Sequence, residues 1–68
     1  MNKAELKVEM IRHNDTGEDL ANALNITRQT LSRKMNDTNA FFTQGEISII
    51  RTRYELTGER IEQIFFAN

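Results

Sequence analysis

The sequence predicts an all-α fold, a compact bundle of five short helices. Alternation of apolar and polar residues at period two, which marks a half-buried strand, does not persist anywhere in the chain. Apolar residues instead recur three and four positions apart, and the helix-capping residues Ser, Thr, Asn and Asp punctuate the sequence between these segments. With 68 residues, the chain is expected to form one domain over residues 1–68.

The first helix is expected over residues 3–13. Leu6 and Met10 lie four positions apart and should share one buried face, which Ile11 widens. Asn14 is expected to end this helix, because asparagine tolerates the left-handed conformation in which helices terminate.

The second helix is short and is expected over residues 17–24. Thr16 is in place to cap it, and Asp19 stands three residues later, as in a capping box. The sequence leaves open whether Asp15 or Thr16 is the cap. Asn25 is expected to end the helix, so that only three residues separate it from the next one.

The third helix is capped by Thr27 and continues to about Asn36. At about 100° per residue, Gln29 and Arg33 lie about 160° from Leu31, which should face the core. Gln29 and Arg33 are therefore expected to project together into solvent.

The fourth and fifth helices are expected over residues 44–55 and 58–66. Thr43 and Glu46 form a second capping box ahead of the fourth helix. Thr57 interrupts the apolar pattern again just before the fifth helix.

The apolar residues at helical spacing are expected to form one core that needs no cofactor. These residues are Leu6, Met10, Leu20, Leu24, Ile26, Leu31, Ile47, Ile50, Tyr54, Ile61, Ile64 and Phe65. His13, near the end of the first helix, is expected at the surface.

Composition argues against several classes of protein. The chain has no cysteine and one histidine, so neither thiol chemistry nor a zinc site is expected. It has three scattered glycines and no glycine-rich phosphate loop, and we expect no enzyme, no cofactor and no small-molecule substrate. No segment approaches the length of a membrane span or resembles a signal peptide, which makes the cytoplasm the expected location.

Positive charge is concentrated in one part of a chain whose formal net charge is -1. Residues 20–36 contain no acidic residue but include Arg28, Arg33 and Lys34. Such a stretch in a mildly acidic domain indicates a one-sided electrostatic surface. The alternative interpretation is an ordinary solvated helix face.

The outward side chains of the third helix are of the types that can form hydrogen bonds with DNA bases. Glutamine can form two hydrogen bonds with adenine, and arginine can form two with guanine. Gln29 and Arg33 are therefore suited to base edges, and Thr30 and Ser32 flank them. A short preceding helix and a tight turn are the arrangement that holds a recognition helix in the major groove.

One motif in this region consists of Leu20-Ala21, then Asn25-Ile26 after three residues, and Leu31 five residues further on. It resembles the helix-turn-helix of lambda-repressor-like domains, the Cro/repressor or XRE type. In that motif the second residue must be small where the helices cross, and Asn25 stands at a turn position that is usually glycine. The segments around residues 6–12, 30–36 and 42–66 extend the similarity to short phage-type repressors of Gram-positive bacteria.

The resemblance implies a set of DNA contacts. The residues expected at base edges are Arg28, Gln29, Ser32 and Arg33, and Arg28 could instead meet a phosphate near the start of the helix. The residues expected at phosphates are Gly17, Glu18, Thr27, Thr30, Lys34 and Asn36. Gly17 replaces a glutamine that is common in the family, and Asp15 replaces an apolar residue. Both departures weaken the phosphate contacts expected there, and the acids at positions 15, 18 and 19 would repel DNA if they faced its backbone.

The predicted function is a sequence-specific regulator of transcription that binds a double-stranded DNA operator, as a Cro-like phage or prophage repressor does. Ile49 and Phe66 point away from the expected core and could form the surface of a homodimer, including one that depends on DNA. The alternative is a small phage modulator that binds a partner repressor protein rather than DNA.

Overall fold

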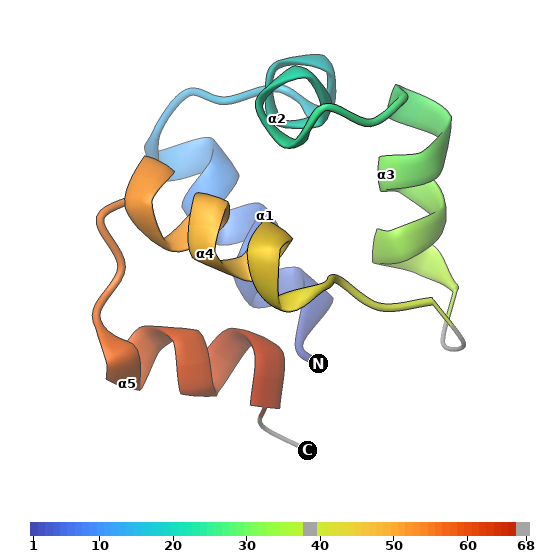
Figure 1. The fold of residues 1–68 in the computed structure, drawn as a ribbon. Coiled ribbons are helices and arrows are strands. Elements are labelled where there is room, and N and C mark those ends of the chain that lie inside the picture. The colour runs from blue at the N-terminus through green and yellow to red at the C-terminus, as the bar shows by residue number, and fades with distance from the viewer. Residues whose placement is uncertain (38–39, 67–68) are drawn as a thin grey trace.

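The computed structural model describes residues 1–37 and 40–66 of the chain. These residues form five α-helices, and the last of them runs on directly into a π-helical segment, η1 (Figure 1). The elements are α1 (Lys3–Arg12), α2 (Gly17–Leu24), α3 (Arg28–Asn36), α4 (Gln44–Arg53), α5 (Gly58–Ile61) and η1 (Glu62–Phe66). The described residues contain no strand, so the all-α prediction is confirmed.

Every α-helix begins at a residue whose side chain accepts a hydrogen bond from the backbone N–H three positions later. The caps are Asn2, Thr16, Thr27, Thr43 and Thr57. Both expected capping boxes are present, at Thr16 with Asp19 and at Thr43 with Glu46. Thr16, not Asp15, therefore caps α2. Each such cap stabilises its helix by about 1 kcal/mol.

Three residues with positive φ reverse the chain after helices. Asn14 and Asn25, both expected as helix ends, have φ values of 52° and 58°. Glu55 has a φ of 52°, so α4 stops at Arg53 and not at residue 55 as expected. The turn at Glu55 directs Leu56 into the core, although the sequence pattern suggested only a helix boundary there.

The core contains buried side chains from all six helical segments. Its most deeply buried side chains, Leu6, Leu20, Leu31, Ile50 and Ile64, come from five different helical segments. The predicted core is confirmed, with Ile26 and Ile47 half-buried against its edge. The structure adds Ala21, Met35, Phe42 and Leu56 to the buried set.

The prediction for Ile11 was wrong, because its side chain is 79% exposed. The buried face of α1 consists of Leu6, Glu9 and Met10. Ile11 lies about 140° from Leu6 around the helix, while Glu9 lies only about 60° from Leu6 on the other side. The inner surface of α1 is therefore partly polar, contrary to the apolar pattern.

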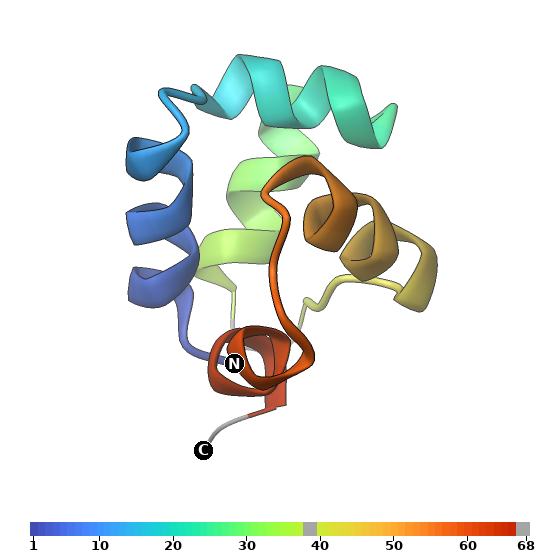
Figure 2. The same ribbon diagram turned by 90° about the vertical axis from the view of Figure 1, so that its left-hand side faces the viewer.

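The start of α1 meets the last described helical segment, η1, on the side of the molecule opposite α2. In both views α2 lies across one end, and α5 with η1 lies at the other (Figure 1, Figure 2). The N–H of Asn2 donates to the carbonyl of Ile64 at 2.6 Å. This contact places the start of α1 against the C-terminal segment.

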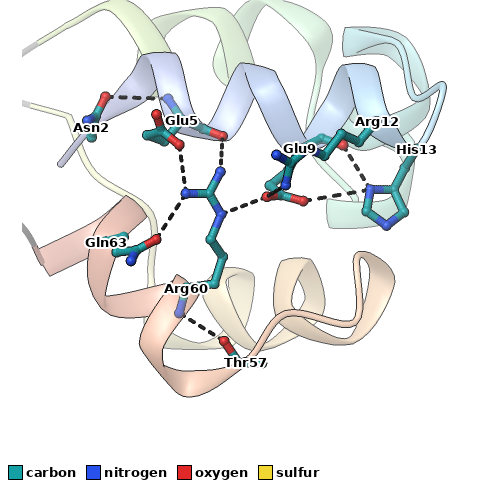
Figure 3. A network of polar contacts seen from close by, with 8 residues as sticks. All are labelled: Asn2, Glu5, Glu9, Arg12, His13, Thr57, Arg60 and Gln63. Atoms are coloured by element: carbon teal, nitrogen blue, oxygen red, sulfur yellow. Dashed lines mark hydrogen bonds and ion pairs between the residues drawn. The ribbon is translucent and has the colours of Figure 1, made fainter.

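A buried ion pair joins these two segments (Figure 3). The Nε of Arg60 donates to Oε2 of Glu9 at 2.6 Å, and its Nη1 lies 2.6 Å from Oε2 of Glu5. The side chain of Glu9 is 4% exposed, so Arg60 supplies a charge partner that burial makes necessary. Gln63 accepts a further hydrogen bond from Arg60 at 3.1 Å.

Candidate nucleic-acid interface

Helices α2 and α3 form a helix-turn-helix. Asn25, in the left-handed conformation, directs its N–H back to the carbonyls of Ala21 and Asn22. The N–H of Ile26 also donates to the carbonyl of Ala21, at 3.0 Å. Thr27 then caps α3, so three residues make the turn. Ala21 is 2% exposed, as expected for a small residue at the crossing of the two helices.

Helix α3 has one buried and one exposed face, as the sequence predicts. Leu31 and Met35 are buried. The four residues predicted to touch bases, Arg28, Gln29, Ser32 and Arg33, are all exposed. A shallow groove runs along this face and is lined by Gln29, Ser32, Arg33, Asn36 and Asp37. We call it the reading groove.

Hydrogen bonds between residues three or four positions apart hold the polar side chains beside this groove. The hydroxyl of Thr27 donates to the hydroxyl of Thr30 at 2.9 Å and accepts from the Thr30 N–H at 3.0 Å. The amide of Asn36 donates to the carbonyl of Ser32 at 2.8 Å and to its hydroxyl oxygen at 3.2 Å. The Ser32 hydroxyl keeps its own proton for another acceptor.

The cations of α3 differ in whether they have partners. Within residues 1–37 and 40–66, the side chains of Arg28 and Arg33 form no hydrogen bond or ion pair. Lys34 instead donates from Nζ to Oε1 of Glu46 and to the carbonyl of Phe41, both at 3.1 Å. Its side chain is only 17% exposed. A phosphate contact of Lys34 would have to replace this pairing.

Glu46 is ionised in this pair. Burial opposes its charge, but hydrogen bonds from the backbone of Thr43 and from Lys34 outweigh burial and hold the pKa of Glu46 below its ordinary value. The same carboxylate completes the capping box of α4. Lys34 and Glu46 therefore join α3 to the start of α4.

The start of α2 lies next to α3. The Thr16 hydroxyl accepts from the N–H of Asp19, and no hydrogen bond inside the described part of the chain uses the N–H groups of Gly17 and Glu18. The Nε of Arg28 lies 3.8 Å from where a Cβ on Gly17 would be. This helix end therefore has unused donors and an adjacent guanidinium, which are the groups that bind phosphate.

One of the three acids at the start of α2, Asp15, is neutralised by a cation. Arg53 donates to both carboxylate oxygens of Asp15, at 2.7 and 2.8 Å, and the Tyr54 hydroxyl also donates to Asp15. The hydrogen bond from Arg53 is the main reason that the pKa of Asp15 is lowered. With Asp19 engaged in the capping box, Glu18 is the acid left exposed without a partner within the described part of the chain.

Sequence reasoning missed Arg53 and Tyr54 as supports of this helix end. Both lie at the end of α4, where the pattern predicts that the helix ends near residue 55 and that Tyr54 is a core residue, with no polar role for either. The ring of His13 stacks on Tyr54, with centroids 4.9 Å apart, so this surface histidine packs against the same support. No local signal could have linked these residues to Asp15.

Ile49 and Phe66, the expected dimer residues, are 41% and 59% exposed. Ile49 lies in a shallow groove between α2 and α4, which Ala23, Ser48, Thr52 and Arg53 also line. Their exposure agrees with the sequence pattern, and their part in self-association stays a prediction.

Comparison with known proteins identifies one family. The model of the Mga helix-turn-helix domain matches residues 2–68. No curated protein and no solved structure matches the chain. The match agrees with the observed helix-turn-helix, and the narrower lambda-repressor-like assignment stays a prediction. Among the described residues, no helix has the length and apolar character needed to cross a bilayer, and no group of three or more potential ligands is placed to hold a metal.

Proposed function

This chain belongs to the Mga helix-turn-helix domain family, and from that premise we propose that it is a sequence-specific regulator of transcription that binds double-stranded DNA. Helix α3 is the recognition helix and enters the major groove with its exposed face toward the bases.

The observation that carries the proposal is the charge of that face. Arg12, Lys34, Arg53 and Arg60 are each held by an acid inside the domain. Arg28 and Arg33 have no such partner in the described part of the chain, and they flank Gln29 on the outer face of α3. An exposed pair of uncompensated arginines favours an anionic partner.

Gln29 and Arg33 are the proposed base readers. They lie four residues apart, line the same groove and have side chains that form two hydrogen bonds with adenine and guanine, respectively. Ser32 and Arg28 flank this pair. Ser32 is proposed to meet a base edge, and Arg28, near the start of α3, is proposed to meet a base edge or a phosphate.

Phosphate contacts are proposed on both sides of the reading groove. The backbone N–H groups of Gly17 and Glu18 point from the start of α2, where the helix dipole favours an anion. Thr27, Thr30 and Asn36 supply polar side chains along α3, and Lys34 joins them by exchanging Glu46 for phosphate.

The narrower proposal is a Cro-like repressor of a phage or prophage that binds its operator as a homodimer. Exposed Ile49 and Phe66 are the proposed self-association residues. Two recognition helices about 34 Å apart would then meet successive turns of the major groove on one face of the duplex.

The proposal is tested by selecting duplexes from a random-sequence pool with the full chain at low salt, followed by sequencing. Enrichment of a half-site that binds more tightly than a scrambled duplex supports it. A chain that is folded but binds no duplex contradicts it. Salt-insensitive binding to a repressor protein would then favour the adaptor alternative.

A further inference from the structure

A cleft opens where α1, the start of α2 and α3 meet. It has a volume of about 230 Å³. Met10, Leu31 and Met35, all buried, line its inner part, and exposed Lys7 and Arg28 line its outer part. Lys7 and Met10 belong to α1, outside the helix-turn-helix.

The cleft is electropositive. No acidic residue of the described chain lines it. The side chains of Lys7 and Arg28 form no ion pair or hydrogen bond within residues 1–37 and 40–66. Arg12, another cation of α1, is instead bound to Glu9 at 3.2 Å. Lys7 is therefore free to meet an external anion.

The cleft adjoins the reading groove, because Ser32 and Asn36 line both. A DNA strand whose bases face α3 has its backbone along one side of that helix. The cleft lies on the side of α1 and contains Gly17, whose missing side chain leaves its rim open beside Arg28.

We propose that this cleft seats a phosphate of the DNA backbone, with Lys7 on one side and Arg28 on the other. The inference rests on the proposed function and extends the contact surface from α2 and α3 to α1. A lysine ammonium acts as a point charge toward phosphate, and an arginine can add two parallel hydrogen bonds.

The test measures how DNA affinity depends on salt for the full chain and for variants. Lys7→Gln removes the proposed contact, and Arg51→Gln is the matched control. Arg51 is exposed on α4, has no acidic partner among the residues that the structure describes, and lies near Gly58 at the start of α5, away from the cleft. Both variants remove one positive charge, so any general loss of attraction is shared.

We expect Lys7→Gln to weaken binding severalfold, and equally on operator and scrambled duplexes. The slope of log K against log salt should become less steep by about 0.9, the value for one phosphate contact. Lys7→Arg should keep the wild-type slope, and so should Arg51→Gln. Circular dichroism checks that each variant is folded.

If the slope of log K against log salt for Lys7→Gln equals that of the unmodified chain, the inference is overturned and the proposed DNA-binding function still stands. An equal change of slope in Lys7→Gln and Arg51→Gln would also overturn it, since the effect would then be one of net charge. If the unmodified chain binds no duplex at low salt, the proposed function fails and the inference fails with it.

Discussion

The guanidinium of Arg53, at the end of α4, binds both carboxylate oxygens of Asp15, in the connection before α2, at 2.7 and 2.8 Å. The side chain of Asp15 is 7% exposed in this arrangement. The contact neutralises an acid beside the proposed DNA surface and ties the start of α2 to the core through α4.

The Asp15–Arg53 contact predicts acid sensitivity. The pKa of Asp15 is lowered in the folded state, chiefly by the hydrogen bond from Arg53, so the ionised carboxylate stabilises the fold above its unfolded value of 3.8. That stabilisation is lost as the pH falls through the lower folded value. We expect Asp15→Asn to reduce the free energy of unfolding by about 1–2 kcal/mol at pH 7 and by less at pH 3.

Chemical denaturation at the two pH values checks this. Glu46, whose pKa is also lowered, makes its own contribution in the same direction and remains in both proteins, so the difference between them isolates Asp15. An equal loss at pH 7 and pH 3 would contradict the assigned role of its charge.

The two arginines that bind Glu9 should differ in how much they contribute to the free energy of unfolding. The side chain of Arg60 is 18% exposed, and that of Arg12 is 65% exposed. We expect Arg60→Ala to destabilise the fold by about 3 kcal/mol, because it leaves the buried carboxylate of Glu9 without its main partner. Arg12→Ala should change stability by less than about 1 kcal/mol. Thermal unfolding of both variants makes the comparison, and equal losses would count against the burial argument.

The outward position of Ile11 gives a simple test of the fold. Leu31, which is 2% exposed beneath the turn, serves as the buried reference, and Leu31→Ala should lower the free energy of unfolding by about 2–5 kcal/mol. Ile11→Ser should change stability by no more than about 0.5 kcal/mol. A large loss from Ile11→Ser, measured by urea denaturation, would show that α1 is rotated relative to the structure.

Arg33 should determine specificity rather than general affinity. We expect Arg33→Ala to cost about 1–3 kcal/mol of binding free energy on the selected operator and to relax preference at one base pair. Fluorescence anisotropy with operator and scrambled duplexes measures both effects. Equal losses on the two duplexes would place Arg33 among the phosphate contacts.

Self-association is expected to depend on Ile49 and Phe66. A charged substitution at an apolar contact is unfavourable, so Ile49→Asp and Phe66→Asp should each shift a dimer toward monomer without unfolding the chain. Sedimentation velocity with and without operator measures the effect. As a control, Ile11→Asp alters another exposed isoleucine and should leave association unchanged.

Local sequence determined where the helices of this protein begin and which side of α3 faces out. A capping threonine acts on an N–H three residues away, and the faces of α3 follow from helical spacing alone, so neither depends on distant parts of the chain. The exposed set of Arg28, Gln29, Ser32 and Arg33 could be predicted for that reason.

Tertiary structure alone decided which charges are free and which are paired. Lys34 and Arg33 are neighbouring cations in the sequence, yet within the described part of the chain only Lys34 forms an ion pair, with Glu46. Asp15 is neutralised by Arg53, which lies on another helix. Glu9 faces inward because Arg60 meets it there, which leaves Ile11 in solvent. Lys7 joins Arg28 at one cleft only because α1 packs beside α3. Ion pairing depends on distances of a few ångströms between segments far apart in the chain, and helical periodicity carries no information about them.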